Sequence, residues 1–290
     1  MTSPVEPVTC ARPPLSTYAP AEPSRFIPEE HWAVFREVLA AARATGVPFA
    51  LGGGLAISFY TGLWRPSKDL DLYILRADRE AVIRAVTGLG LRDYFDAAPY
   101  DRAWIYRAYG RGVIVDLIWA LANGIADVDP SWLGCGVVAE VEGEPLPLIS
   151  PEEMFWSKVH VVQRDRCDWP DLVNLLLMAG PAFDWQRLLR RLGSEQPLLA
   201  AVLALFAWLA PGRSAQLPKW LWSRLGLRPP EDGPVLDRRR VDLLDSRPWV
   251  TPAAVNLEAA ASETRRRPRP QTLTVGRAGR GPRSAGTSKA

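Results

Sequence analysis

Apolar residues along this chain change their spacing near residue 149. Residues 29–45 place apolar side chains every three or four positions, which predicts an amphipathic helix. Short runs rich in β-branched and aromatic residues follow, and they predict strands at 47–51, 69–75, 104–109, 113–119 and 137–141. Helices are expected among these strands at 54–60 and 78–87. Strands and helices mixed in this way indicate an α/β or α+β domain.

From residue 150 onward the pattern is helical. The segment Ser150-Pro151-Glu152-Glu153 combines a capping serine, a proline at the first helical position and a glutamate at the third, which predicts a helix start. Further helices are expected at 169–179, 185–192 and 198–209. The longest apolar run, residues 197–210, is shorter than the roughly 20 residues that cross a bilayer. We therefore expect a core helix there and no membrane partner.

Composition and charge divide the chain further. Residues 1–28 form a Pro-rich leader and residues 229–290 a Pro- and Arg-rich tail, both expected to be extended or disordered, around domains at 29–149 and 150–228. The net charge is +3, but residues 264–290 hold eight basic and no acidic residues, so residues 1–263 carry −5. This acidic body does not favour a nucleic-acid partner, although the tail arginines could attract phosphates. Because no secretory signal is recognisable, a cytoplasmic location is expected.

The scarcity of cysteine and histidine excludes several kinds of chemistry. Three cysteines and two histidines do not suit a disulfide framework, a histidine-rich metal site or a Ser-His-Asp hydrolase. The reaction must therefore use carboxylates, lysines, arginines and backbone groups.

Residues 49–75 hold the candidate chemistry. The first strand ends in Gly52, Gly53 and Gly54, and a helix begins at once, which presents free N–H groups suited to an anion. Asp69 and Asp71 are two positions apart on the next strand, so their carboxylates share one face. Two carboxylates held together repel each other unless a divalent cation lies between them. The alternative for each acid is a solvated strand end.

Three more charged residues extend this candidate site. Arg65 and Lys68 would supply positive charge beside it. Asp116 interrupts the apolar strand 113–119, where an unpaired carboxylate would be costly, and it would join the other acids if the two strands are neighbours. Three such carboxylates can hold two Mg²⁺ ions for in-line attack on a nucleoside triphosphate, with Asp116 activating the attacking hydroxyl. Asp116 could instead be a turn residue or an ion-pair partner.

The conjunction of these motifs resembles the nucleotidyltransferase superfamily, in its small bacterial members related to AbiEii-type toxin and aminoglycoside nucleotidyltransferases. Gly52-Gly53 matches the glycine turn, Asp69 and Asp71 the metal strand, and Asp116 the third acid. The likeness continues into a P-E-E-M-x-x-x-K segment and covers about residues 30–225. It implies a small mixed sheet with flanking helices as the catalytic domain, followed by a helical part.

The resemblance also implies an activity. It is the transfer of a nucleoside monophosphate from a nucleoside triphosphate, ATP first, to a hydroxyl, with Mg²⁺ (two ions, or Mn²⁺ in their place) and release of pyrophosphate. Lys158 would reach the triphosphate or the substrate; the alternative is a lysine at the protein surface. Gly54 stands where many relatives carry a phosphate-binding serine, so only backbone donors remain there.

The acceptor stays open at this point. A small cationic molecule such as an aminoglycoside suits an acidic body. A tRNA end or a protein side chain, as in toxin-like relatives, is the second enzyme hypothesis. The alternative to an enzyme is a non-catalytic nucleotide-binding module or a toxin–antitoxin partner on the same fold.

Two side-chain clusters have two interpretations each. The acids and arginines of residues 163–171 would form an ion-pair network or contact the nucleotide, with Asp168 capping the following helix. Trp64 and Trp119 flank the acidic strands and would stack on a base or pack in the core.

Overall fold

A five-stranded mixed sheet forms the first half of the protein. The computed structural model describes residues 27–244 except 63, 65–66 and 142; Arg65, the leader and most of the tail therefore lie outside the described residues. In the sheet order β1-β2-β5-β4-β3, only β2 and β5 are parallel. The strands are β1 (Phe49–Leu51), β2 (Asp69–Ile74), β3 (Arg92–Asp93), β4 (Ile105–Gly110) and β5 (Val113–Ile118).

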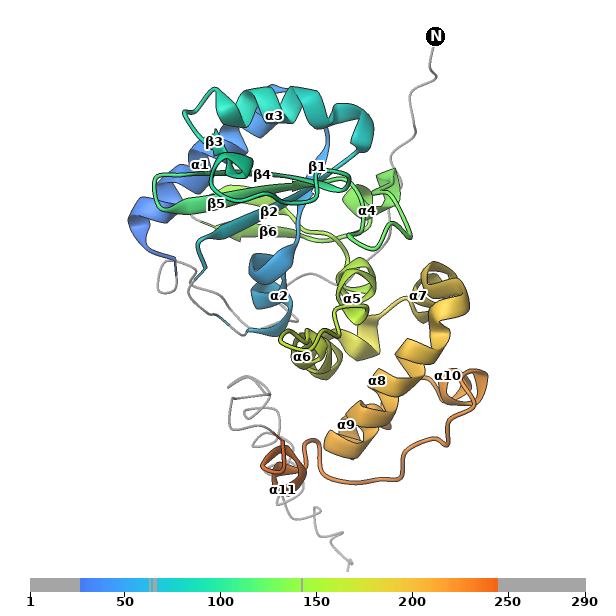
Figure 1. Cartoon of the computed structure of the whole chain (residues 1–290). Helices are drawn as coiled ribbons and strands as arrows, with labels where there is room; N and C mark the ends of the chain where they lie inside the picture. The colour runs from blue at the N-terminus through green and yellow to red at the C-terminus, as the bar shows by residue number, and fades with distance from the viewer. Residues whose placement is uncertain (1–26, 63, 65–66, 142, 245–290) are drawn as a thin grey trace, which may run out of the picture.

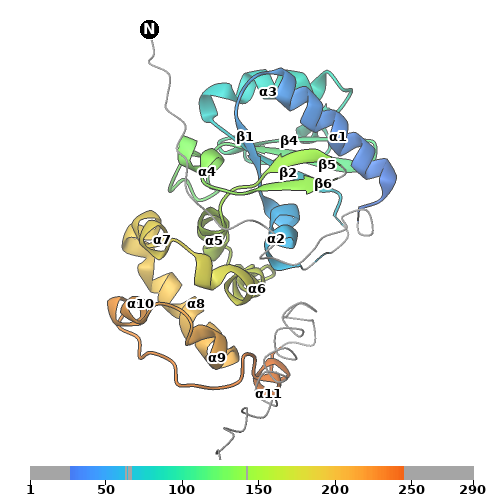
Figure 2. The same ribbon diagram turned by 180° about the vertical axis from the view of Figure 1, so that it is seen from behind.

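Helices cover both faces of this sheet (Figures 1 and 2). On one face, α1 (Glu29–Ala44) and α3 (Arg79–Thr87) lie over the strands. Four side chains of β2 and β5 point to that face and are completely buried: Leu70, Leu72, Val115 and Leu117. On the other face lie α2 (Gly53–Thr61), α5 (Pro151–Val159) and α6 (Trp169–Ala179). The period-2 alternation of the strands thus separates an apolar face from a face that carries polar groups.

The remaining elements are short or belong to the helical half. A small hairpin and a helix, β6 (Val138–Val141), β7 (Glu144–Pro147) and α4 (Pro130–Gly134), flank β1 and β2. The helical half continues with α7 (Trp185–Leu192), α8 (Gln196–Leu209), α9 (Pro211–Ser214), α10 (Lys219–Arg224) and α11 (Arg238–Val241). Single 3-10 turns lie at Arg76–Asp78, Tyr94–Asp96, Gly180–Ala182 and Gly193–Glu195. The predicted mixed α/β class with a helical C-terminal part is confirmed.

Packed structure continues beyond the boundary that the sequence suggested at residue 228. Leu236 is buried, and the Asp237 N–H donates to the Leu209 carbonyl at the end of α8 (2.7 Å). The short helix α11 packs against α8. Residues 229–244 are therefore part of the helical half, although they include three prolines and three arginines.

One helical stretch, Trp185–Leu209, has the length and the mean hydropathy (1.5) of a membrane span. Within it, Gly193 has φ +52° and separates α7 from α8. The longer piece, α8, has 14 residues and spans about 21 Å, less than the roughly 30 Å of a bilayer core. This composition also suits the core helix of a globular protein.

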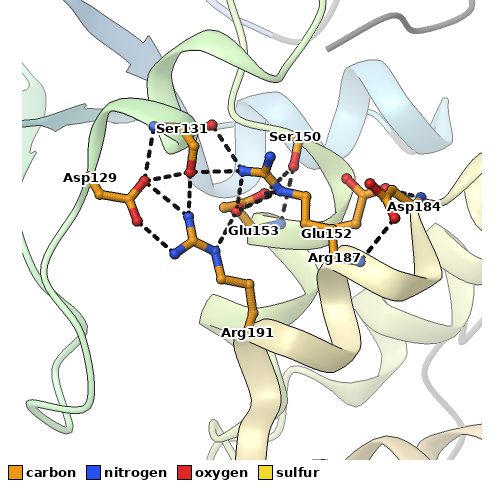
Figure 3. Close-up of polar contacts among 8 residues, drawn as sticks. All are labelled: Asp129, Ser131, Ser150, Glu152, Glu153, Asp184, Arg187 and Arg191. Carbon is orange, nitrogen blue, oxygen red and sulfur yellow. Dashed lines mark hydrogen bonds and ion pairs between the residues drawn. The ribbon is translucent and has the colours of Figure 1, made fainter. Parts of the chain in front are cut away.

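A buried ion-pair network joins the two halves (Figure 3). Glu153, in the first turn of α5, is completely buried and accepts hydrogen bonds from Arg187 and Arg191 of α7 (2.7 and 3.0 Å). Arg191 also donates to both carboxylate oxygens of Asp129 (2.6 and 3.0 Å), and Arg187 donates to the Ser131 carbonyl (3.0 Å). The network therefore fixes α4, α5 and α7 relative to one another.

Local caps complete this arrangement. Ser150 caps α5 by accepting the Glu153 N–H, as its sequence predicts, and Asp129 caps α4. Burial raises the pKa of Asp129, but hydrogen bonds from Arg191 and Ser131 outweigh burial and lower it to about 2. The resulting stabilisation is present above about pH 4 and is lost as the pH falls toward 2.

Replacing the buried carboxylate tests this network. Glu153→Gln keeps the shape of the side chain but leaves two arginines without their central counter-charge, so we expect a loss of about 3 kcal/mol in the free energy of unfolding. Urea unfolding at pH 7 measures it. The matched control is Glu29→Gln, since Glu29 is exposed and pairs with Arg36 at the surface; its stability should not change. Equal losses in the two variants would contradict a special role for Glu153.

Candidate functional site

The two acidic strands are direct neighbours in the sheet. Strands β2 and β5 pair in parallel with Asp71 opposite Asp116 and Asp69 opposite Ile114. The expectation that Asp69, Asp71 and Asp116 gather on one face is therefore confirmed at the level of strand register. Asp69 is exposed, Asp71 is half-buried and Asp116 is only 4% exposed.

The glycine turn lies against the same acids. Strand β1 is antiparallel to β2, and the Gly52 N–H donates to the Asp71 carbonyl (3.0 Å). Gly53 has φ +56°, and a Cβ on it would lie 1.7 Å from Asp71 Oδ2. Only glycine allows this close approach. Helix α2 begins here without a side-chain cap, so its first N–H groups, on Gly53, Gly54 and Leu55, have no partner within the helix.

A cavity of about 780 Å³ opens over these groups, within the size range of small-molecule sites. It contains most of the expected residues, namely Gly53, Gly54, Lys68, Asp69, Asp71, Asp116 and Lys158. Gly52 does not line it, because the Tyr73 ring covers its Cα. Lys68 is exposed at its edge.

Sequence analysis missed Arg107, which lies on β4 directly opposite Asp116. Its Nε donates to Asp116 Oδ1 (2.7 Å) and its Nη2 to Oδ2 (2.6 Å). Burial raises the pKa of Asp116, and hydrogen bonds from Arg107 only partly offset that rise. The turn at 110–112, which contains two glycines, is a signal that could have revealed this pair. If the turn pairs Gly110 with Val113, then the residue three positions before Gly110, Arg107, pairs with the residue three positions after Val113, Asp116.

Asp71 differs from Asp116 in having no hydrogen bond from any described side chain or N–H group. Burial, together with the negative charges of Asp116 and Asp69, raises the pKa of Asp71 to about 7, although the positive charges of Lys158 and Arg107 offset part of the rise. Asp71 is therefore the group of the site that most needs a nearby positive charge.

The donor set fits a divalent cation at two of the three acids. Asp69 and Asp71 offer carboxylate oxygens without a cationic contact among the described residues, and Mg²⁺ is commonly held by one or two carboxylates together with substrate phosphates. In the described part of the chain, no group of three or more His, Cys, Asp or Glu side chains is arranged to hold a metal. At this site both Asp116 oxygens accept hydrogen bonds from Arg107, so Asp116 differs from the other two acids.

Lys158 lies on the opposite wall, in a network of its own. Its Nζ donates to Asp168 (2.7 Å) and Asp171 (2.8 Å), and Arg166 also pairs with Asp168. The expected ion-pair network is thus present, but the expectation that Asp168 caps α6 is wrong. Its carboxylate instead binds these two basic side chains.

Other aromatic and histidine residues complete the lining. Trp104 and His31, which the sequence did not connect with the acids, line the cavity. Trp119 packs in the core, with its Nε1 donating to the Ala103 carbonyl, and neither Trp119 nor Trp64 lines the cavity. Only tertiary packing brings α1 and the start of β4 to this site, so no local sequence pattern announces them.

A family model described as an uncharacterised nucleotidyltransferase matches residues 31–210. The chain belongs to this family. The match includes the glycine turn, the three acids and Lys158, and it confirms the resemblance drawn from the motifs. As a family member, the protein is a nucleotidyltransferase enzyme, whose general reaction is transfer of a nucleoside monophosphate.

Comparison with other proteins adds little about the substrate. No curated protein matches this nucleotidyltransferase. Similar solved structures include ANT(2'')-Ia in complex with adenylyl-2''-tobramycin (20% identity, 60% of this chain and 97% of that chain, TM-score 0.37). Lincosamide antibiotic adenylyltransferase LnuA with lincomycin (16%, 49% and 94%, 0.37) and an antigenic nucleotidyltransferase-like protein from Paracoccidioides brasiliensis (15%, 68% and 98%, 0.38) are also similar. Matches of this strength do not identify an acceptor.

The raised pKa of Asp71 predicts a pH-dependent gain in stability on substitution. Because the pKa in the folded protein (about 7) exceeds the ordinary value, the charged form opposes folding above pH 7, and protonation relieves this as the pH falls toward 4. Asp71→Asn should therefore raise the melting temperature at pH 8 in EDTA, and the gain should shrink at pH 5. Asp96→Asn, at an exposed position outside the cavity, is the control and should show no gain. A lower melting temperature for Asp71→Asn at pH 8 would contradict the assignment.

The contact between Gly53 and Asp71 predicts a second result. Gly53→Ala places a Cβ on the Asp71 carboxylate, whereas Gly46→Ala meets nothing within 4 Å at a similar φ of +72°. Both variants should lose about 1 kcal/mol in the free energy of unfolding from left-handed backbone strain, and Gly53→Ala should lose more because the Asp71 carboxylate must move; urea unfolding measures both losses. Only Gly53→Ala should lose thermal stabilisation by Mg-ATP. If both variants retained it, the turn would not position the acid.

Proposed function

We propose that this enzyme transfers a nucleoside monophosphate from a nucleoside triphosphate, ATP first, to a hydroxyl of a small-molecule acceptor and releases pyrophosphate. The reaction is proposed to need Mg²⁺, with Mn²⁺ as a substitute. One observation carries the proposal: Asp69 and Asp71 face a cavity directly beside the start of α2. Carboxylates and helix N–H groups are the donors that a metal–triphosphate complex requires.

Each part of the cavity has a task in this proposal. Asp69 and Asp71 would hold the divalent cation, which when bound neutralises phosphate charge. The first N–H groups of α2 would bind phosphate oxygens, with Gly53 keeping the backbone close to Asp71. Lys68 and Lys158 would add positive charge, and Asp168 and Asp171 fix the Lys158 ammonium in place.

The chemical step follows from these positions. The acceptor hydroxyl oxygen attacks the α-phosphorus as the bond to the β-phosphate oxygen breaks, and pyrophosphate leaves. The hydroxyl proton passes to Asp116, whose raised pKa suits a base better than an ordinary aspartate would.

The walls support a small acceptor that is not a polycation. Asp116 and Asp168 are paired with Arg107 and Lys158, so few acids remain for a cationic ligand. Apolar side chains line another part of the cavity: Trp104, Ile105, Ile118 and Leu121. An acceptor with hydroxyls and an apolar surface fits this lining better than an aminoglycoside, and the cavity volume of about 780 Å³ favours a small molecule over tRNA or a protein.

A transfer assay tests the proposal. Purified protein is incubated with four α-labelled nucleoside triphosphates, Mg²⁺ or Mn²⁺, and separate panels of aminoglycosides, less charged hydroxylated compounds, tRNA and proteins. We expect label in a small-molecule product, and a loss of at least about 100-fold in Asp69→Asn and Asp71→Asn, because a lost metal ligand removes charge stabilisation. Asp96→Asn serves as the matched control and should retain activity.

Each of the other possible results would support a different hypothesis. Label on tRNA or protein would overturn the small-molecule acceptor. Metal-dependent ATP binding without transfer to any panel would favour a non-catalytic nucleotide-binding module. Full activity in Asp71→Asn would contradict the metal assignment.

A further inference from the structure

Arg107 is the only described cation that hydrogen-bonds to any of the three acids. Its fork geometry takes both oxygens of Asp116, and its own position on β4 is fixed because its N–H donates to the Tyr100 hydroxyl (3.0 Å). The Arg107 side chain is 35% exposed, whereas the Asp116 side chain is 6% exposed. The arginine can therefore turn toward the cavity, while the aspartate has almost no access to water.

This contact places Arg107 in competition with a metal ion. A guanidinium is always charged and pairs with a carboxylate through two parallel hydrogen bonds. A divalent cation held by Asp69 and Asp71 can extend its coordination to Asp116, which pairs with Asp71 in the sheet, only by taking an Asp116 oxygen that now accepts from Arg107. Asp116 is buried, so leaving its carboxylate without a cationic partner would be costly. When Arg107 moves away, the metal ion must therefore take its place.

We propose that Arg107 is a positioning residue that holds Asp116 until the metal–nucleotide complex binds, then yields one Asp116 oxygen and donates to a phosphate. This inference rests on the proposed function and concerns how its site is regulated. The consequence is that the protein alone binds divalent cations weakly, because Arg107 occupies the third acid. Binding then becomes tight only when a triphosphate offers Arg107 a new partner.

Direct measurement of Mn²⁺ binding to the full chain, by the electron paramagnetic resonance signal of free Mn²⁺, tests this without any turnover. Without nucleotide, Arg107→Gln should bind Mn²⁺ about tenfold more tightly than the unmodified protein, because it removes a positive charge next to the ion. With ATP present the order should reverse, since the variant lacks the phosphate donor. Arg107→Lys, which keeps the charge without the fork, should lie between the two.

Two controls locate the effect. Arg102→Gln removes an arginine that pairs with Asp93 outside the cavity, and it should leave Mn²⁺ binding unchanged. Because Arg107→Gln could destabilise the fold by leaving Asp116 unpaired, the double variant Arg107→Gln/Asp116→Asn is measured as well. It removes both charges and should return Mn²⁺ affinity to that of the unmodified protein.

The outcomes separate this inference from the proposed function. If Asp71→Asn does not weaken Mn²⁺ binding, the metal site itself is wrong and the proposed function fails. If Asp71→Asn abolishes binding but Arg107→Gln and the double variant both bind like the unmodified protein, the metal site stands and the competition is overturned. Tighter binding in Arg107→Gln that the double variant cancels supports the proposal.

Discussion

Repulsion between two carboxylates on neighbouring strands governs the chemistry of this protein. Parallel pairing of β2 and β5 sets Asp71 beside Asp116, on a face that the second layer of helices largely shields from water. Repulsion in such a place is only weakly screened. Two features reduce this repulsion. Arg107 contacts Asp116 from the next strand, and Asp71 faces a cavity where a ligand can supply positive charge.

Acidic and apolar residues alternate along β2. This alternation places the acids on one face of the sheet and also fixes the register of the strand. Leu70 and Leu72 alternate with the acids of β2, so they point to the opposite face of the sheet, and both are completely buried. Helices α1 and α3 cover that face (Figure 1). A slip of one residue would bury the carboxylates beneath those helices and expose the leucines, so alternative pairings are strongly disfavoured. The apolar face therefore stabilises an arrangement of charges that is unfavourable by itself. On the opposite side, Trp132 of α4 stacks on Tyr73 (5.4 Å), and the buried Glu153 network fixes α4.

Sequence reasoning succeeded where local periodicity decides the structure. The shared face of Asp69 and Asp71 follows from a period of two, and the start of α5 follows from Ser150 and its neighbours. It failed where a contact with a residue distant in the sequence decides the partner of a side chain. Asp168 has the pattern of a cap, yet Lys158 from the preceding helix takes its carboxylate.

The distribution of charge in the cavity bears on how a nucleotide is accommodated. Lys158 and Arg107, the cations nearest to Asp71, are each already paired with aspartates. A triphosphate adds several negative charges, and the start of α2 offsets only about half a unit charge. Among the described residues, Lys68 by itself cannot balance the remaining negative charge beside Asp69 and Asp71. A nucleotide can therefore bind only if it brings a metal ion with it, or if a basic side chain leaves its present ion pair to contact the phosphates. Arg107 is the better donor of the two, because its side chain is the more exposed and the Asp116 carboxylate that it leaves lies where a metal ion could replace it.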